Sequence, residues 1–280
     1  MQLDGLAPKG GVRRAAVLGH PIGHSLSPVL HGAAYRALGL PYEYVAIGVT
    51  EAGLADFLAD CDDSWMGLSL TMPLKRTVLP FLDAVDPVAQ RIRAANTVIF
   101  SDGERLGFNT DVAGIQTTLR EIQVQQYPGD VAILGAGATA AAVLSALVEL
   151  HPSRVRIAAR RVEPALDAVE LASEMGLNAE ATLWQDSTEL LRSDLVISTL
   201  PGDAAASFAP HVPHNPGKLL DVTYSPWPTT LAGAWDRAGG TVAPGYRMLL
   251  WQAAVQVELM TGFQAPVSAM FEALEAALEG

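Results

Sequence analysis

The sequence is poor in charged residues and has no excess of basic ones. Only 17% of its 280 residues are Asp, Glu, Lys or Arg, and 50% are hydrophobic, whereas an average globular chain carries about 25% charged residues. Disordered chains show the opposite balance, so we expect a folded, apolar-rich protein. The 18 Lys and Arg are outnumbered by 30 Asp and Glu, which leaves a formal net charge of −12. Without a basic surface, neither nucleic acid nor a membrane is an expected partner.

Cysteine is also scarce. The single cysteine, Cys61, cannot form a disulfide within the chain, so nothing indicates an oxidising compartment. The N-terminal region lacks a long apolar segment after a charged one, because the apolar run that follows Arg14 covers only residues 15–18. We therefore expect a cytoplasmic protein without a targeting segment.

One uncharged run is long enough to suggest a membrane span. Eighteen residues without a charge lie between Asp130 and Glu149, which is about the minimum length of a transmembrane helix. Residues 131–134 are typical of a short buried strand, however, and Gly135 and Gly137 of a tight turn. The Ala, Leu and Val residues that follow indicate a buried helix. The run thus predicts a strand, a turn and a helix.

The length corresponds to about two domains, and the pattern indicates two α/β domains. In the second half, apolar strands alternate with helices, which is typical of a mostly parallel sheet covered by helices on both faces. Its expected strands are residues 131–134, 154–158, 194–198 and 218–222, with a helix after residue 137 and another over 164–175. In the first half we expect strands over 15–18, 42–47, 65–69, 97–100 and 105–108, and helices over 28–38, 51–59 and 74–82.

Two further helices are expected at the C-terminus, over residues 247–260 and 266–278. No strand candidate follows them. From the pattern alone, they either extend the second domain or return to cover the first.

The glycine turn matches a dinucleotide-binding fingerprint. The pattern Gly135-x-Gly137-x-x-Ala140 follows an expected strand and opens an expected helix. Glycines allow the backbone to approach a pyrophosphate, which binds to the N–H groups of a helix N-terminus. A tight turn without a ligand is the alternative.

The choice of dinucleotide depends on the end of the next strand. An NAD site normally has Asp or Glu there, about 20 residues after the glycines, to bind the ribose 2′-hydroxyl. This chain has Ala159, Arg160 and Arg161 instead, and two guanidinium groups attract a 2′-phosphate. Taken alone they could be exposed surface arginines, but with the glycine turn they favour NADP.

A substrate site is indicated near the N-terminus. Ser27 and Pro28 are typical of a helix start, with Ser27 as N-cap and Pro28 as the first helical residue. Capping does not require Ser25, which would project to the same side of an extended segment. Two hydroxyls beside a helix N-terminus suit a substrate carboxylate.

Several segments resemble, in order, the signature segments of the shikimate dehydrogenase family. They are residues 19–28 with His31, residues 70–75, residues 95–97, residues 109–111 and Gly245-x-x-Met248-Leu249-x-x-Gln252. With the glycine turn they make six ordered motifs over about residues 15–262. The resemblance implies reversible reduction of 3-dehydroshikimate to shikimate with NADPH, in chorismate and aromatic amino acid biosynthesis.

The resemblance also implies the site residues. Ser25 and Ser27 would bind the substrate carboxylate, and the rest of the substrate would meet Thr71, Lys75, Asn96, Asp111, Tyr224 and Gln252. The cofactor would contact Gly135, Ala136, Gly137, Ala138, Thr139, Ala159, Arg160, Arg161, Val222, Gly245 and Met248. The implied domains are a substrate domain, 1–111 with 247–280, and a Rossmann-like NADP domain, 112–246, with the active site in the cleft. The protein would be a monomer or a homodimer.

Lys75 and Asp111 would be the catalytic pair. We expect Lys75 to donate and accept the proton, and Asp111 to position Lys75 and a substrate hydroxyl. Taken alone, Lys75 could be a solvated surface lysine, and Asp111 a cap for a helix over 112–119. The family motifs around them favour the catalytic interpretation.

The chain departs from many family members at four places. It has Ser69-Leu70-Thr71 for Asn-Val-Thr, Ala138 for a third Gly, Ala159-Arg160-Arg161 for Asn-Arg-Thr, and Ser198-Thr199-Leu200 for Asn-Ala-Thr. None of these changes affects the expected catalytic pair.

Two other functions remain open from sequence, namely an NAD-using quinate/shikimate dehydrogenase and a catalytically silent NADP-binding sensor. Arg160 and Arg161 speak against the first, and the presence of both Lys75 and Asp111 against the second. No metal is expected, because Pro21 and Gly23 interrupt any helical spacing among His20, His24 and His31.

Overall fold

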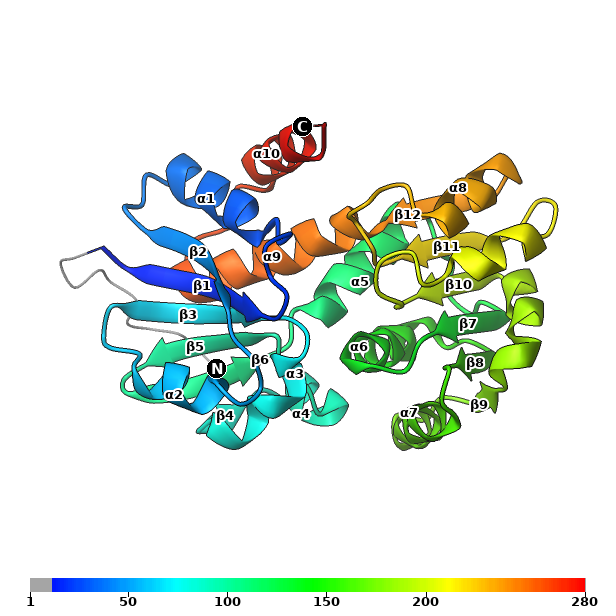
Figure 1. Ribbon diagram of the computed structural model, residues 1–280, viewed down its shortest axis with the longest axis horizontal. Coiled ribbons are helices and arrows are strands. Elements are labelled where there is room, and N and C mark those ends of the chain that lie inside the picture. The colour runs from blue at the N-terminus through cyan, green and yellow to red at the C-terminus, as the bar shows by residue number, and fades with distance from the viewer. Residues whose placement is uncertain (1–11, 280) are drawn as a thin grey trace. The chain divides into compact units, whose positions relative to one another are not determined.

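The computed structural model describes residues 12–279. The first eleven residues, on which part of the expectation about a targeting segment rests, and Gly280 lie outside this range. The chain forms two compact units (Figure 1). The first contains the chain up to Thr110 and again from Leu250, and the second is Asp111–Leu249. None of the helices within 12–279 is long and apolar enough to cross a membrane.

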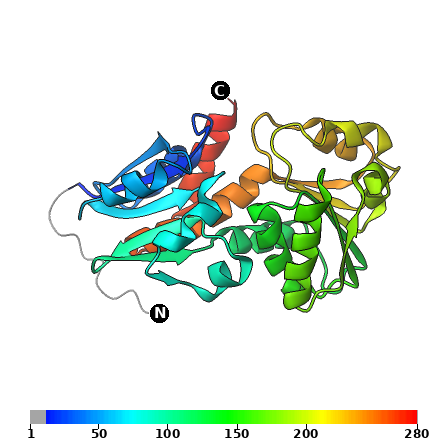
Figure 2. The same ribbon diagram turned by 60° about the horizontal axis from the view of Figure 1, so that its bottom comes forward.

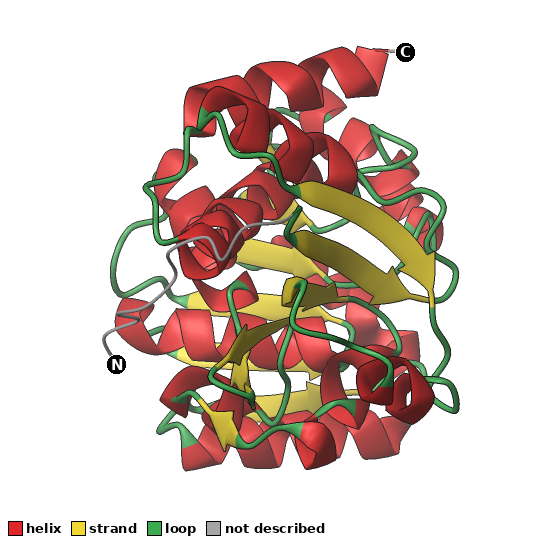
Figure 3. Ribbon diagram, turned by 90° about the vertical axis from the view of Figure 1, so that its left-hand side faces the viewer, coloured by secondary structure: helices red, strands yellow, loops and turns green. Residues whose placement is uncertain are grey.

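The first unit contains a mixed six-stranded sheet, sheet A, whose strand order is β2-β1-β3-β5-β6-β4. Strand β1 pairs in parallel with β2 and β3, and β4 with β6, whereas β5 runs antiparallel to β3 and β6. The twist of its strands is visible in Figure 3. The strands are β1 (Arg14–Gly19), β2 (Glu43–Gly48), β3 (Trp65–Leu70), β4 (Ala84–Val85), β5 (Thr97–Ser101) and β6 (Glu104–Phe108).

Two of the predicted helices of the first unit differ from the prediction in extent. The helix expected over 74–82 is divided into α3 (Leu74–Thr77) and the 3-10 helix η1 (Leu79–Phe81). Pro80 explains the break, because it has no N–H to continue an α-helix. The helix expected over 51–59 is shorter, since α2 is Leu54–Ala59.

Helix α4 (Pro87–Ile92) was not predicted, although its start has a clear cap. The Asp86 side chain accepts hydrogen bonds from the backbone N–H of Ala89 at 2.8 Å and of Val88 at 3.3 Å. Helix α1 (Ser27–Ala37) packs against α10 (Val267–Glu279). The chain after residue 250, with most of α9 (Gly245–Thr261), therefore belongs to the first unit, which decides the question that the sequence pattern left open.

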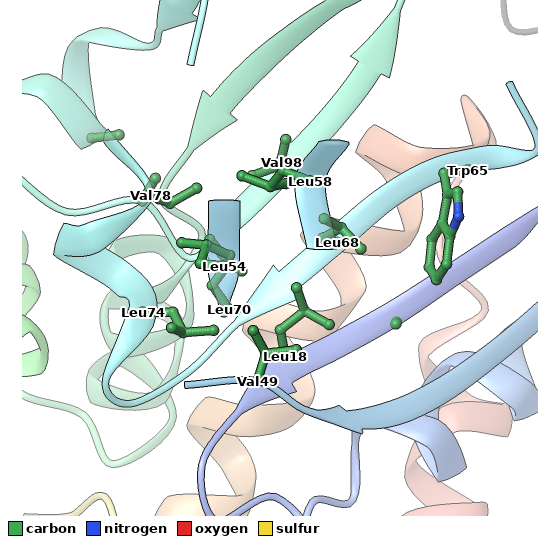
Figure 4. Packing of buried hydrophobic residues seen from close by; sticks show 13 residues of the cluster. Leu18, Val49, Leu54, Leu58, Trp65, Leu68, Leu70, Leu74, Val78 and Val98 are labelled. Carbon is green, nitrogen blue, oxygen red and sulfur yellow. The ribbon is translucent and has the colours of Figure 1, made fainter. Parts of the chain in front are cut away.

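The hydrophobic core of the first unit shows why residues 15–18 of β1 are all apolar. Ala16 and Leu18 pack against residues of α2 and α3 in one buried cluster, part of which Figure 4 shows with Leu54 and Leu74. Ala15 and Val17, which alternate with them, are also buried. Because neighbouring residues of a strand point to opposite faces, both faces of this strand are covered.

The second unit contains a fully parallel six-stranded sheet, sheet B, with strand order β12-β11-β10-β7-β8-β9. Its strands are β7 (Asp130–Leu134), β8 (Arg154–Ala158), β9 (Ala179–Thr182), β10 (Leu195–Ser198), β11 (Lys218–Asp221) and β12 (Thr241–Pro244). The order reverses between β7 and β10, so the chain winds outward in both directions from there. In such sheets ligands bind at the carboxyl ends of the strands at this switch point.

The uncharged run is β7, a glycine turn and α6, as predicted. Figure 2 shows α5, α6 and α7 in green beside one another, and they pack in that order. The helices of this unit are α5 (Asp111–Glu121), α6 (Ala138–Leu147), η2 (Val148–Leu150), α7 (Val162–Glu174), η3 (Trp184–Arg192), η4 (Ala206–His211) and α8 (Thr230–Arg237). Helix α8 and strands β9 and β12 were not predicted.

Candidate active site

Ser25 and Ser27 lie in the loop between β1 and α1 and at the start of α1. The expected N-cap role of Ser27 is wrong, because the N-cap is Leu26 and makes no side-chain cap. Ser27 is the first helical residue, and its backbone N–H donates to the Ser25 Oγ at 3.3 Å. The Ser27 side chain is buried, and its hydroxyl lies near the phenol of Tyr44. The hydroxyl of Ser27 is thus not used for capping.

Thr71 and Lys75 follow β3. The Thr71 N–H donates to the carbonyl of Leu18 at 2.9 Å, so the segment that follows β3 stays attached to the end of β1. Lys75 is the second residue of α3 and is half-buried, which disagrees with a freely solvated surface lysine. Its carbonyl accepts from the N–H of Ala95 at 2.8 Å. The backbone of Lys75 is therefore tied to the residue that precedes Asn96.

Asn96 is buried and fixed at both ends of its carboxamide. The Oδ1 atom accepts from the Thr97 Oγ1 and from the Thr110 N–H, both at 2.8 Å. The Nδ2 atom donates to the Thr110 Oγ1 at 3.0 Å and to the Gln252 Oε1 at 3.4 Å. The structure thus brings together Asn96 and Gln252, two predicted substrate residues that are far apart in the sequence.

Asp111 follows Thr110 directly and is the first residue of α5. It is only 4% exposed. A carboxylate in the first turn of a helix is stabilised by the helix dipole. Asp111 does not precede this helix as a cap; it begins it.

The predicted cofactor residues of the second unit follow the carboxyl ends of strands in sheet B. Residues 135–139 follow β7, residues 159–161 follow β8, Val222 follows β11 and Gly245 follows β12. Parallel strands place these segments at one edge of the sheet. This edge includes the switch point between β7 and β10, where a dinucleotide is expected.

The two glycines of the turn have different roles. Gly135 has a φ of +114°, and a Cβ atom there would collide with the Thr199 Oγ1. Its N–H donates to the carbonyl of Ala158 at 2.7 Å. Gly137 is the N-cap of α6, and nothing lies within 4 Å of the position its Cβ would take. Gly135 is therefore required by the fold, whereas Gly137 leaves open space before a helix N-terminus.

Ser198, the last residue of β10, lies at the switch point. Its hydroxyl is buried and has no hydrogen-bond partner within the described chain. A buried polar group without a partner is rare in a folded protein. Together with the open space at Gly137, it fits a site that receives a polar ligand.

Arg160 and Arg161 are both exposed, and among residues 12–279 neither forms an ion pair. By contrast, Arg154 and Arg156 of the same strand segment pair with Asp130 at 2.6 and 3.3 Å. Two guanidinium groups at the end of β8 are thus available for a phosphate. This arrangement fits NADP better than NAD.

Val222 and Gly245 lie against each other, since a Cβ atom on Gly245 would collide with the Val222 carbonyl. Met248, the last predicted cofactor residue, is 7% exposed on α9. Tyr224, two residues after Val222, is half-buried, and burial raises the pKa of its phenol.

Asp221, which ends β11, was not among the residues predicted from the sequence. Burial raises the pKa of its carboxyl, although hydrogen bonds from Thr229 and Thr223 oppose this shift. The Thr229 Oγ1 donates to Asp221 at 2.7 Å and accepts from the Ala232 N–H as the cap of α8. Asp221 therefore connects the segment before Tyr224 to the start of α8. A single acidic residue at the end of an apolar run could have indicated it.

None of the three N-terminal histidines takes part in a metal site within residues 12–279, where no group of three or more potential ligands occurs. His31 is fully buried and stacks on Tyr44 with ring centroids 3.9 Å apart. Burial lowers its pKa from 6.5 to about 3, and the hydrogen bond with Gln256 opposes this only in part. His31 is thus a neutral core residue.

This burial predicts how stability depends on pH. Below pH 6.5 the unfolded chain protonates His31, whereas the folded chain does not until about pH 3. The unfolded state therefore binds more protons in this window, and His31 lowers the free energy of unfolding by up to about 1.4 kcal/mol for each pH unit as pH falls. Above pH 6.5 His31 is neutral in both the folded and the unfolded state, so it no longer lowers the free energy of unfolding. His31→Gln should flatten urea-unfolding midpoints between about pH 6 and about pH 5.

The exposed His214 provides the control for this measurement. His214→Gln should keep the pH dependence of the wild-type protein. Equal slopes for His31→Gln and the wild type would contradict the prediction.

These features define an α/β protein whose second unit has the features of a dinucleotide-binding sheet and whose first unit carries clustered polar residues. Three family models match the chain: the shikimate dehydrogenase substrate binding domain over residues 17–98, a coenzyme F420-dependent NADP oxidoreductase over 130–223, and the shikimate 5'-dehydrogenase C-terminal domain over 245–275. Relatives that are 34% and 37% identical to this chain match it over nearly their whole length. The chain belongs to the shikimate dehydrogenase family.

Shikimate dehydrogenase (NADP(+)) of Moorella thermoacetica is 34% identical, with 96% of this chain and 95% of the relative covered. The enzyme of one strain of Thermus thermophilus is 37% identical, with 95% and 98% covered. A crystal structure of shikimate 5-dehydrogenase from another strain of Thermus thermophilus, in complex with NADP(H) and shikimate, has a TM-score of 0.84 and 34% identity, with 95% of this chain and all of that chain (100%) covered.

Proposed function

We propose that this protein catalyses the reversible, NADP-dependent interconversion of 3-dehydroshikimate and shikimate. The observation that carries the proposal is its similarity, over nearly the whole chain, to enzymes named shikimate dehydrogenase (NADP(+)). A similar structure that contains both NADP(H) and shikimate supports the same pair of ligands. The reaction would serve the biosynthesis of chorismate and aromatic amino acids.

The predicted substrate and cofactor residues fall mostly into two different parts of the chain. Residues 1–111 with 247–280 would bind the substrate, and residues 112–246 would bind NADP. In the first group, hydroxyls of Ser25 and Ser27 would donate hydrogen bonds to the substrate carboxylate. Lys75, Asn96 and Asp111 would bind ring hydroxyls, and Thr71 and Gln252 would complete the pocket. Tyr224 would be the one substrate residue contributed by residues 112–246.

NADP, when bound, supplies or accepts the hydride, so the chain itself must orient the substrate and move one proton. In the reducing direction, the Lys75 ammonium would hydrogen-bond the substrate carbonyl oxygen and donate a proton to it. In the oxidising direction, neutral Lys75 would accept the proton from the hydroxyl. Asp111 would hold Lys75 and a neighbouring hydroxyl in place.

The experiment that tests the proposal is spectrophotometric detection of NADPH formed from shikimate and NADP+ by the purified protein. No NADPH at millimolar shikimate would exclude the enzyme and leave the silent NADP-binding sensor. Parallel assays with NAD+ and with quinate distinguish the proposal from an NAD-using quinate/shikimate dehydrogenase. We expect the highest kcat/KM for NADP+ with shikimate.

The two arginines at the end of β8 lead to a prediction about cofactor choice. Replacing Arg160 and Arg161 together with alanine should raise KM for NADP+ by about 10- to 100-fold, since a charge-assisted hydrogen bond contributes about 1.5–3 kcal/mol. KM for NAD+ should stay unchanged, because NAD+ has no 2′-phosphate. Arg192→Ala, at an exposed position of η3, is the control and should change neither value. Equal losses with both cofactors would contradict a 2′-phosphate contact.

A further inference from the structure

Gln256 is a buried residue that none of the roles above uses. It lies on α9, one helical turn after Gln252, and is 1% exposed. Its Nε2 donates to the Thr97 Oγ1 at 2.9 Å and to the Asn96 carbonyl at 3.3 Å. Its Oε1 accepts from the Ser69 Oγ at 2.8 Å and lies 3.3 Å from the His31 Nε2. A carboxamide has two N–H donors and two acceptor positions, so all four are used.

These bonds fix which way the carboxamide of Asn96 points. Because Thr97 accepts a hydrogen bond from Gln256, its own hydroxyl proton is free to be donated to the Asn96 Oδ1 at 2.8 Å. The same Oδ1 accepts from the Thr110 N–H. The oxygen of Asn96 is thereby held among donors. Its Nδ2 donates to the Thr110 Oγ1 at 3.0 Å and, over a longer 3.4 Å, to the Gln252 Oε1, which is the contact that a ligand oxygen would replace.

The other side of Gln256 leads to a second predicted substrate residue. Ser69 donates to Gln256 and accepts from the Tyr44 hydroxyl at 2.6 Å. The Tyr44 phenol also lies near the Ser27 hydroxyl. One buried chain of hydrogen bonds thus joins Tyr44, beside Ser27, to Asn96, and Gln256 is its central member.

We propose that Gln256 is a positioning residue for the substrate, which acts through Thr97 to make Asn96 present its N–H, not its oxygen, to the ligand. The inference rests on the proposed function, in which Asn96 binds a ring hydroxyl. It also specifies the chemistry at that position. The substrate must offer an oxygen with a free lone pair, so a hydroxyl or a carbonyl is accepted and a group that can only donate, such as an ammonium, is rejected.

Thr97 gives the sharpest test, because valine has the same shape without the hydroxyl and serine keeps the hydroxyl. Thr97→Val should raise KM for shikimate about tenfold and leave KM for NADP+ within about twofold, and Thr97→Ser should keep wild-type values. Gln256→Leu should act like Thr97→Val, and the double variant should be no worse than either single variant, since both interrupt one chain.

A buried polar residue elsewhere on α9 separates positioning from loss of stability. Thr261 is 4% exposed, and its hydroxyl donates to the Val257 carbonyl at 2.7 Å. Thr261→Val should leave KM for shikimate within about twofold, whatever it does to the thermal midpoint. If Thr97→Val is folded and keeps the wild-type KM for shikimate, or if KM follows stability in all variants including Thr261→Val, the proposal is overturned.

A readout without activity keeps the inference separate from the proposed function. In the 15N-labelled protein, the Asn96 carboxamide protons should exchange slowly in the wild type and in Thr97→Ser, and faster in Thr97→Val. Unchanged exchange in Thr97→Val would overturn the positioning role even if shikimate is the substrate. A wild-type protein that does not oxidise shikimate but shows the expected exchange would contradict the proposed function and retain the orientation of Asn96.

Discussion

Lys75→Ala is expected to lower kcat for shikimate oxidation by about 10²- to 10⁴-fold, the usual effect of losing a general acid or base. Lys75 is half-buried as the second residue of α3, and its carbonyl accepts from the N–H of Ala95, so its backbone is held in place. The residue next to Ala95 is Asn96, whose carboxamide is fixed. Steady-state kinetics in both directions would measure the loss, with KM for NADP+ near the wild-type value.

The neighbouring Arg76 supplies the matched control. It is exposed on the same short helix, so Arg76→Ala should keep kcat within about twofold. If Lys75→Ala retains nearly wild-type turnover and only binds shikimate more weakly, Lys75 is a binding residue and the proton has another donor. Asp111→Asn should then be tested for the same loss.

The fold was predictable where a segment carries its own pattern. Residues 15–18 of β1 and 131–134 of β7 are continuous apolar runs because both faces of each strand are covered, and such runs are visible in the sequence. The missed strands β4, β9 and β12 all lie at the edge of a sheet. They have two to four residues and little hydrophobic pattern, because an edge strand needs less burial to stay in place.

Helix ends were less predictable than helices. Ser27 was expected to be the N-cap of α1, yet the helix begins at Ser27, and its side chain is buried near Tyr44, a residue of another element. A tertiary contact thus replaced the local one. In contrast, the cap of α4 by Asp86 follows local rules, since Asp directly before Pro is a typical helix start.

In the candidate site, too, residues defined by a local segment were predictable, whereas residues defined by distant contacts were not. Gly135, Arg160 and Arg161 follow from a strand, a turn and the chemistry of phosphate, all within a short segment. Gln256 could not be identified this way, because its partner Ser69 is 187 positions away in the chain. Its position on a helix with an apolar face indicates only burial. Only the folded structure shows that Gln256 is connected to Asn96 through hydrogen bonds with Thr97.

The two glycines of the nucleotide turn should respond in opposite ways to the same substitution. Gly135→Ala should destabilise the second unit by about 3 kcal/mol or more, since alanine is strained at a φ of +114° and its Cβ would collide with Thr199. Gly137→Ala should leave stability within about 0.5 kcal/mol, because its φ is −87° and no atom lies within 4 Å of the new methyl group.

Gly137→Ala, which should hardly change stability, should instead weaken the binding of NADP+. Its open space lies before the N-terminus of α6, where the pyrophosphate is expected, so the methyl group of Gly137→Ala should weaken NADP+ binding by about tenfold or more. Thermal unfolding with and without NADP+ measures both quantities on one protein. A stable Gly137→Ala that is still stabilised by NADP+ like the wild type would place the pyrophosphate elsewhere. A Gly135→Ala as stable as the wild type would show that the turn can relax away from Thr199.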